Sequence, residues 1–486
     1  MLLDTEILVW LALAVPFIGT ALVPLVAKGG NTARVIFAVV MGFLTAAMVL
    51  LLLPEVWIGA SRGLVYSFAW APSIGLEFTV YIDPLSAMMA AIAGGIGALV
   101  LLYSVKYMEG HTGLSRYYAL VLLFIGGMIG LVFVDNLLVL YFFWEIVGLC
   151  SYALIGFYTT DPKAARAGIK ALVTTRVGDS AFLIGIFVLA AGAMGSLGVG
   201  FWESLSLRYL IANAGALQAG TLALAGFCFI LGAVGKSAQV PLHVWLPDAM
   251  EAPTTISALI HAATMVNAGV YLMARTLPLF AGVTGWTQAL MWIGAITAFL
   301  AATMALVEPD IKRVLAYSTV SQLGYMIFGI GLGFVGFAGA TFHLMSHAVF
   351  KALLFLGAGA VIHAVGTRNM YQMGGLGKEM KLTHLTMVVG GLSLAGLIPL
   401  SGFWSKDMIL AEGLHELGGP GTVPLVLLVL TAFLTAAYTF RMLNLVFWGR
   451  SRRSKAAHEA PWQMSAPLLI LMVGAVISWI AVGFLV

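Results

Sequence analysis

Ionisable side chains interrupt the long apolar stretches of this sequence. Lys236 lies in the run LALAGFCFILGAVGK, five positions before Pro241, and Lys406 follows Pro399. A charge within a membrane-spanning helix costs at least about 2.5 kcal/mol on insertion scales and typically marks an ion or proton path. The residues placed in this way are Glu145, Arg176, Asp179, Lys236, His261, His343, His347, Lys351, Lys406, Asp407 and Arg441.

These residue types fit proton transfer. Desolvation weakens the hold of a buried lysine on its proton, and a nearby carboxylate strengthens it. A carboxylate that moves can therefore switch a lysine, and histidine titrates near neutral pH and can act as a relay. We interpret Glu145 as the natural partner of Lys236. A proline break frees backbone carbonyls and lets water approach, which applies at Pro241 and again at Pro399.

Structural roles are alternatives for several of these residues. Arg176 and Asp179 are three residues apart and could neutralise each other on one helical face. His261 could be a hydrogen-bonded core histidine, and Arg441 could lie near the membrane interface. Lys406 and Asp407 are adjacent and point about 100° apart on a helix, which makes them poor partners.

A stripe of three titratable groups strengthens the case for a polar path. His343, His347 and Lys351 follow an i, i+4, i+8 spacing, which places them along roughly 12 Å of one helical face. Two histidines at i, i+4 can bind zinc, but no HExxH pattern or acidic third ligand accompanies them. We therefore predict no metal site.

The elements that position these residues are membrane-spanning helices. The 486 residues are 61% hydrophobic and 9% charged, which predicts an all-α polytopic membrane protein. Apolar runs of bilayer-spanning length predict fourteen transmembrane helices, with the seventh and twelfth broken at Pro241 and Pro399. They fall near 7–27, 33–53, 82–104, 117–134, 137–158, 166–192, 219–240, 254–276, 287–306, 312–332, 335–364, 383–412, 422–447 and 463–486.

A weak internal repeat divides the chain. Lys170-Ala171 recurs as Lys351-Ala352, and Lys236 recurs as Lys406, each beside a break. We predict two five-helix repeats, 117–276 and 287–447; the odd number of helices inverts the second, as in many transporters. The segment 1–116 contributes three spans and an outer hairpin within 54–81. The segment 448–486 adds a basic loop and the last span.

Charge asymmetry predicts the orientation, because loops rich in Lys and Arg stay in the cytoplasm. Alternating the spans places only Arg62, Arg208 and Arg275 on the other side. The cytoplasmic set is Lys28, Arg34, Lys106, Arg116, Lys163, Arg166, Lys312, Arg313, Arg368, Lys378, Lys381, Arg450, Arg452, Arg453 and Lys455. We therefore expect a multi-pass protein of the cell (inner or cytoplasmic) membrane, with both termini outside and no cleaved signal peptide.

Other functions are disfavoured. Cys150 and Cys228 are isolated in apolar runs, so no iron–sulfur or zinc ligand set is expected. No glycine-rich nucleotide motif follows a strand pattern, and we expect no cofactor in this chain. The net charge of +4 is small and dispersed, which argues against a nucleic-acid partner.

Several long motifs resemble the antiporter-like subunits of respiratory complex I, Mrp antiporters and membrane-bound hydrogenases. They are DPLSAMM (83–89), KALVTTRVGD (170–179), KSAQVPLHVWLPDAMEAPTTISALIHAATMVNAGVYLMAR (236–275), KRVLAYSTVSQLGYM (312–326), HLMSHAVFKALLFLGAGAVIH (343–363) and SGFWSKD (401–407). The resemblance covers nearly the whole chain. TRVGD and SGFWSKD are most similar to the subunit-5 type.

The resemblance implies roles by position. Glu145 with Lys236 would be the coupling pair, and His261 and Lys351 would lie on a central polar axis beside His343 and His347. Lys406 would be the exit lysine, and Asp179 would face the charge pair of a neighbouring subunit. Subunit-5 proteins usually continue into a long lateral helix. Val486 ends the sequence before it, so we expect a shorter relative.

Three hypotheses follow. The first is a proton-translocating subunit of a complex-I-related assembly, without redox centres of its own, that works beside homologous antiporter-like subunits and indirectly with redox subunits. The second is an Mrp-type sodium/proton antiporter subunit without a redox partner. The third is a scaffold, or an energising subunit of another complex such as one for inorganic-carbon uptake. Sodium prefers several oxygen ligands, whereas the axis is rich in Lys and His.

Overall fold

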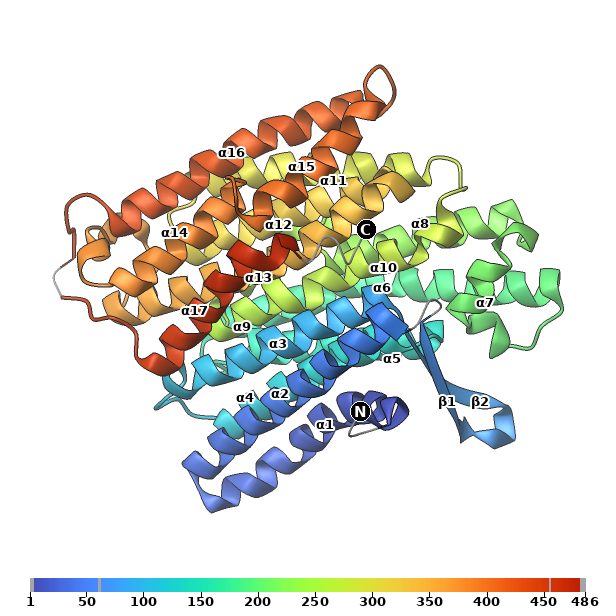
Figure 1. Cartoon of the computed structure of the whole chain (residues 1–486), viewed down its shortest axis with the longest axis horizontal. Helices are drawn as coiled ribbons and strands as arrows, with labels where there is room; N and C mark the ends of the chain where they lie inside the picture. Colours follow the sequence, from blue (N-terminus) through green and yellow to red (C-terminus); the bar gives the residue numbers. More distant parts are fainter. Residues whose placement is uncertain (1–3, 60–62, 454–455, 481–486) are drawn as a thin grey trace.

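Long apolar helices make up most of the chain, because a backbone within lipid must satisfy its own hydrogen bonds. The structure is a computed structural model that describes residues 4–59, 63–453 and 456–480. Lys455 and the end of the last predicted span, 481–486, lie outside the described residues. The helices form one bundle and run roughly along a common direction (Figure 1).

The first half of the bundle contains eight long helical segments. Before the first break they are α1 (Thr5–Val26), α2 (Asn31–Pro54), α3 (Pro84–Tyr107), α4 (Leu114–Phe133), α5 (Leu137–Ile155), α6 (Pro162–Leu197) and α8 (Ala219–Lys236), with the short α7 (Leu207–Ala212) between the last two. The eighth span combines α9 (Thr254–Ala258), the π-helical turn η8 (Leu259–Ala263) and α10 (Met265–Phe280).

The second half repeats this pattern of long helices with one break. Its elements are α11 (Trp286–Val307), α12 (Ile311–Gly331), α13 (Phe334–Val365), α14 (Lys381–Ala395), α15 (Ser401–Gly413), α16 (Thr422–Phe447) and α17 (Trp462–Ile477). Within the described residues, thirteen helical segments are long and apolar enough to cross a membrane. The predicted span 383–412 is divided between α14 and α15, so the count of fourteen stays a prediction.

Both predicted breaks are present. α8 ends at Lys236, and the chain resumes as the 3-10 turns η6 (Leu242–Trp245) and η7 (Asp248–Glu251). α14 ends at Ala395, and α15 begins six residues later. Each break contains its predicted proline, Pro241 or Pro399, and the bonds Val240–Pro241 and Ile398–Pro399 are both cis.

Local sequence signals fix many helix starts. Asp83, Asn136, Asp161 and Asp310 each accept a backbone hydrogen bond from the first turn of α3, α5, α6 and α12. Such N-caps satisfy donors that the helix itself leaves free.

The prediction of a hairpin between spans is confirmed: β1 (Leu64–Ala71) pairs with β2 (Leu76–Ile82) in antiparallel register.

Loops meet at two ends of the bundle. The hairpin and α7 lie at one end, and the loop between α16 and α17 lies at the other (Figure 1). We call these ends the hairpin side and the basic side, since most loop Lys and Arg lie at the second. Backbone bridges join loops of one side only, as between Asn136 and Ser206 or between Asp310 and Asn369. This agrees with the predicted alternation of the spans.

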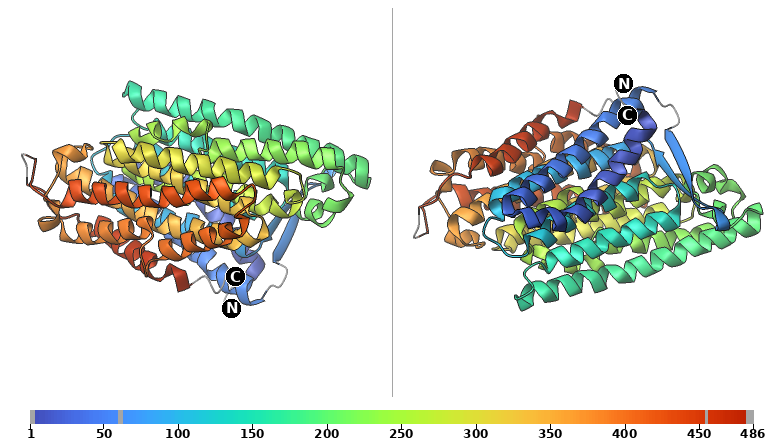
Figure 2. Two further views of the ribbon diagram at one scale, coloured as in Figure 1. Left: turned by 90° about the horizontal axis from the view of Figure 1, so that it is seen from above. Right: turned by 90° about the horizontal axis from the view of Figure 1, so that it is seen from below.

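The helices with the most polar residues lie at the centre. α9, α10 and α12 are buried along nearly their whole length. In both views of Figure 2, α6 lies along an edge of the bundle. α1, α2, α16 and α17 also expose apolar faces. This arrangement places the polar residues away from lipid.

Candidate functional site: a buried row of lysines and histidines

The candidate site is a row of buried side chains, here called the row: Lys236, His261, His343, His347, Lys351 and Lys406. An ion pair between α8 and α6 forms one end of it. The Lys236 ammonium lies 3.2 Å from Asp179 Oδ2, and both side chains are buried. Trp144 on α5 donates from Nε1 to Asp179 Oδ1 at 2.6 Å. Its ring also lies beneath the Lys236 ammonium, 5.5 Å from the ring centroid. Two charges in an apolar interior need this kind of mutual support.

Glycines create the space for this pair. A Cβ at Gly178 on α6 would lie 2.6 Å from the Leu231 carbonyl and 3.1 Å from the Gly235 Cα on α8. The two backbones therefore touch where Asp179 and Lys236 meet. On α5, a Cβ at Gly148 would lie 2.6 Å from the Lys236 ammonium.

A methyl group at Gly148 should displace the ammonium without removing its charge. In Gly148→Ala, we expect ion translocation through the chain to fall between about tenfold and a hundredfold, since misplacement by about 1 Å can have effects of that size. Gly95→Ala is the matched control, because a Cβ there meets no atom within 4 Å. Equal translocation in the two variants, measured in membrane vesicles, would contradict this role of Gly148.

The structure corrects the pairing expected from the sequence. Glu145 binds Arg176 and does not pair with Lys236. Arg176 and Asp179 do not pair either, although they are neighbours on α6. Asp179 does not face outward toward a neighbouring subunit, because it is buried against Lys236. The reason is the glycine contact between α6 and α8, which brings Asp179, and not Glu145, to the lysine.

The Glu145–Arg176 pair lies at the edge of the bundle. The Arg176 side chain is 48% exposed and that of Glu145 is 21% exposed. Around it, α6 exposes the apolar side chains Val173, Val177 and Ile184. This face of α5 and α6 therefore carries exposed apolar side chains and one charged pair. We call it the α5/α6 face.

Two histidines near the centre have no protein partner at either ring nitrogen. His261, in the π-helical turn η8, stacks on Phe355 with ring centroids 5.1 Å apart. His347 on α13 packs against Phe350. Within the described residues, none of the four ring nitrogens makes a hydrogen bond. Water usually satisfies buried polar groups of this kind, which suits a relay.

Lys351 and His343 on α13 contact α12. The Lys351 ammonium donates to Ser318 Oγ and, at 3.3 Å, to the Leu315 carbonyl. His343 hydrogen-bonds Gln322 Oε1 at 3.1 Å through Nε2. The predicted stripe of His343, His347 and Lys351 is therefore buried on α13. Among the described residues, no carboxylate pairs with Lys351.

Lys406 on α15 occupies the far end of the row. Its ammonium donates to the Leu394 carbonyl at 2.6 Å and lies 5.5 Å from the centroid of the Tyr325 ring. The neighbouring Ser405 hydrogen-bonds His343 Nδ1 at 2.9 Å. His343 therefore contacts the residue next to Lys406 on α15.

The two break lysines share a setting. Lys236 is the last residue of α8, and the Lys406 ammonium binds a carbonyl in the last turn of α14. The carboxyl end of a helix carries a partial negative charge that stabilises a cation. Each break therefore supplies a helix terminus to a buried lysine, as in transporters with discontinuous helices.

The remaining predicted residues lie apart from the row. Asp407 is exposed on α15. Arg441 on α16 donates to the Glu308 carbonyl at 2.9 Å and to Tyr371 OH at 3.0 Å, both near the basic side. Arg441 therefore does not contact the row, and its role near the membrane interface stays a prediction.

Sequence reasoning missed several residues that contact the row. They are Trp144, Gly148, Ser318, Gln322, Tyr325 and Ser405. Ser318 and Gln322 carried a signal, because they are polar residues four apart in a predicted span. Gly148 carried none, since its role is only to leave room. In the described part of the chain, no three His, Cys, Asp or Glu residues gather as a metal site.

Two broken spans around a buried row of lysines and histidines define an antiporter-like membrane protein. Residues 134–435 match the family described as NADH:quinone oxidoreductase/Mrp antiporter, TM. Residues 70–118 match the N-terminal family of complex I chain 5. The chain therefore belongs to the family of complex I and Mrp antiporter membrane subunits and is of the subunit 5 or L type.

Similar proteins include a dehydrogenase subunit L and a quinone oxidoreductase subunit 5. F(420)H(2) dehydrogenase subunit L of Methanosarcina mazei is 46% identical over 419 residues, 81% of this chain and 62% of that protein. The chloroplastic NAD(P)H-quinone oxidoreductase subunit 5 of Zygnema circumcarinatum is 48% identical over 406 residues, 81% of this chain and 56% of that protein. The chain thus spans less than two thirds of the length of these relatives.

Two solved structures share the fold. A chain of the Mrp complex from Dietzia sp. DQ12-45-1b aligns with a TM-score of 0.86 and 32% identity, over 98% of this chain and 51% of that chain. A chain of the membrane-bound sulfane sulfur reductase, an archaeal respiratory membrane complex, aligns with a TM-score of 0.87 and 27% identity, over 98% and 96%.

Proposed function

We propose that this chain translocates protons as an antiporter-like subunit of a complex-I-related respiratory assembly. One observation carries the proposal: four ionisable side chains are buried in the bundle, and the lysine at each end lies beside a helix break. They are Lys236, His261, Lys351 and Lys406. In the described part of the chain, the ammonium groups of Lys351 and Lys406 contact hydroxyl and carbonyl oxygens and pair with no carboxylate. Each could therefore pass a proton to a neighbouring relay without breaking an ion pair. His343 and His347 lie beside them as relays.

Contacts with α13 support one connected row. His261 stacks on Phe355 of this helix, and the rings of His343 and His347 lie 6.4 Å apart on it. His343 also hydrogen-bonds Ser405, the neighbour of Lys406. At the other end, Asp179 holds Lys236. Moving that carboxylate away would remove the anion that faces the Lys236 ammonium, which is the switch that the proposal needs. Glu145 and Arg176 would act on the switch from the surface.

We further propose that a homologous membrane subunit covers the α5/α6 face. A guanidinium that faces lipid at mid-membrane depth is costly, and Arg176 is half exposed there. A neighbouring subunit that presents a polar or acidic group would remove this cost. Electron carriers would then be held by other subunits of the assembly, and the loops rich in Lys and Arg would face the cytoplasm, with both termini outside.

An Mrp-type sodium/proton antiporter is the second candidate, and the likeness to the Dietzia Mrp complex favours it. The axis itself favours protons, because its residues are lysines and histidines and Na⁺ prefers several oxygen ligands. Translocation that requires sodium in the purified complex would decide for the antiporter. Mass spectrometry of co-purifying subunits would show whether redox proteins are attached.

The test of the proposed function is Lys351→Ala in the whole complex. We expect proton translocation through this subunit to fall by about a hundredfold or more, the scale of a lost acid–base group. The measurement is acidification of vesicles in response to the substrate of the complex. Ser346→Ala is the control, because Ser346 is buried on α13 and its hydroxyl has no hydrogen-bond partner among the described residues. Wild-type translocation in a fully assembled Lys351→Ala complex would refute the proposal.

A further inference from the structure

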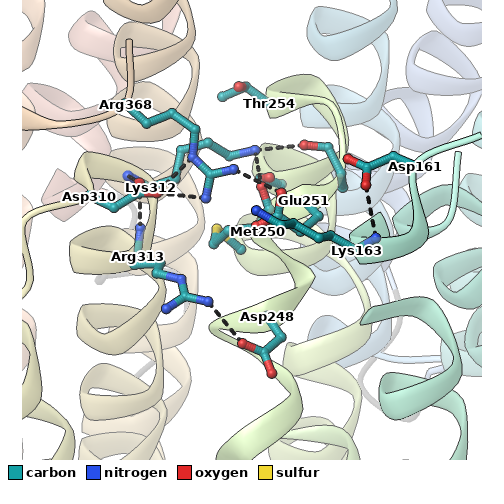
Figure 3. Close-up of polar contacts among 12 residues, drawn as sticks. Asp161, Lys163, Asp248, Met250, Glu251, Thr254, Asp310, Lys312, Arg313 and Arg368 are labelled. Carbon is teal, nitrogen blue, oxygen red and sulfur yellow. Dashed lines mark hydrogen bonds and ion pairs between the residues drawn. The ribbon is translucent and has the colours of Figure 1, made fainter. Parts of the chain in front are cut away.

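A network of charges covers the basic-side end of the row. It joins the turn η7, which follows the first break, to the start of α12 and to the loop after α13 (Figure 3). Its members are Asp248, Glu251, Asp310, Lys312, Arg313 and Arg368. None of them belongs to the row described above.

Lys312 is the buried member of this network. It is 3% exposed, and its ammonium donates to the carbonyls of Met250 at 2.8 Å and Ala252 at 2.6 Å. These carbonyls belong to η7 and the residue after it. Among the described residues, no carboxylate forms an ion pair with Lys312. The turn η7 therefore closes directly over a buried ammonium.

Arg368 ties this turn to the second half of the chain. Its Nη1 lies 3.2 Å from Glu251 Oε2 in η7, and its Nη2 lies 2.6 Å from Asp310 Oδ2 at the start of α12. Figure 3 shows the guanidinium between the two carboxylates. Attraction to Asp310 and Glu251 outweighs burial and raises the pKa of Arg368, so the guanidinium stays charged.

The backbone around Arg368 is anchored, but its side chain is not enclosed. The Arg368 carbonyl accepts from Ile311 N at 3.0 Å, and Met370 N donates to the Pro309 carbonyl at 2.9 Å. The side chain is 29% exposed. The two ion pairs can therefore open toward water while the loop beneath them stays in place.

From Lys312 the polar contacts continue along α12. Leu315 and Ser318, which bind the Lys351 ammonium, lie three and six residues further. Six residues correspond to about 9 Å of helix. Lys312 is thus the link between the basic side and the row.

We propose that Arg368 is a latch: its ion pairs with Glu251 and Asp310 hold η7 over Lys312, and their release admits water to Lys312 and to the row beyond. Arg368 is a positioning residue, because it acts on η7 and not on the transported proton. The proposal rests on the proposed function for its purpose. Its geometry can be tested separately.

Thiol accessibility in the assembled complex is the direct test. Met250 is fully buried beneath the latch, so Met250→Cys reports its opening after Cys150 and Cys228 are replaced with Ala. We expect N-ethylmaleimide to react at least about tenfold faster with this thiol when Arg368→Ala is added, since charge-assisted pairs are lost. Arg368→Lys keeps the positive charge but loses the fork of nitrogens that contacts Glu251 and Asp310 together. It should give a labelling rate between those of Met250→Cys alone and Met250→Cys with Arg368→Ala.

Arg313→Ala is the matched control. Arg313 is similarly exposed, at 36%, and its side chain pairs with the neighbouring Asp248 at 3.0 Å. Its contact with Asp310 is made by the backbone N–H, which Arg313→Ala keeps. The labelling rate should stay within about twofold of the parent. An unchanged rate in Arg368→Ala, or an equal rise in Arg313→Ala, would overturn the latch.

Two further measurements separate the latch from the proposed function. If Arg368→Ala fails to assemble, Glu251→Gln with Asp310→Asn removes both ion pairs and should raise the labelling rate to the same extent. An unchanged labelling rate in this double variant overturns the latch.

Passive proton leak through vesicles should also rise with Arg368→Ala and disappear when Lys351→Ala is added. Faster labelling without any leak refutes water access to the row. Normal translocation in Lys351→Ala, with faster labelling in Arg368→Ala, refutes the proposed function but leaves the latch standing.

Discussion

Replacing Lys236 with methionine is expected to stop proton translocation and to destabilise the fold by about 3–5 kcal/mol, the usual result of removing one partner of a buried ion pair. Methionine keeps most of the volume, so packing is not the cause. The loss arises because Asp179 stays buried with only Trp144 Nε1 as a donor. Thermal unfolding of the purified complex and substrate-driven vesicle acidification measure the two effects.

A second substitution separates the two effects. In Lys236→Met with Asp179→Asn, the uncompensated charge is gone, and Asn can still accept from Trp144. We expect most of the stability to return while translocation stays absent. Recovery of translocation in this double variant would show that the ion pair is only structural. A single Lys236→Met variant as stable as wild type would show that the pair does not persist in the membrane.

Replacing Arg275 with methionine is expected to have an equally large effect on stability and little effect on the row. Arg275 binds Asp83 through both terminal nitrogens, at 2.5 and 2.7 Å, and also contacts Ser86 Oγ and Tyr271 OH. These contacts join α10 to the start of α3 at the hairpin side. Losing the arginine leaves a largely buried carboxylate, at a cost of about 3–5 kcal/mol. The protein that remains folded should translocate normally.

The pH dependence of this pair has a defined sign. Burial tends to raise the pKa of Asp83, but attraction and hydrogen bonds from Arg275 outweigh it and hold the pKa below its usual value. The stabilisation is therefore present above about pH 4, the unfolded value, and is lost as pH falls through the lower folded pKa. The stability difference between wild type and Asp83→Asn should be constant from pH 5 to 8 and shrink in stronger acid. A difference that grows in acid would contradict this assignment.

The sequence predicted the elements of this fold well because each depends on local chemistry. Apolar length determines the spans, and the prolines at 241 and 399 determine where two of them break. The stripe His343, His347 and Lys351 also followed from helical spacing alone. The grouping into inverted repeats stays a prediction, although the two proline breaks are consistent with it.

The partners of the charges were not predictable in the same way. Spacing on α6 placed Arg176 and Asp179 on neighbouring positions, but it could not show that Gly178 touches Gly235 and turns Asp179 toward Lys236. The network around Arg368 depends on loops far apart in sequence. Its members look like ordinary loop charges until the fold brings the loops together.

The position of Arg176 and Asp179 on α6 has a mechanical consequence. The two residues are about 4.5 Å apart along the helix axis, yet one reaches the surface and the other holds a buried lysine. A neighbour that pulls on the surface cation exerts torque on the same helical turn that carries the buried anion. That turn also touches α8 directly, where Gly178 lies against Gly235, so a displacement of the turn at the edge of the protein would act on Lys236 with no other helix between them.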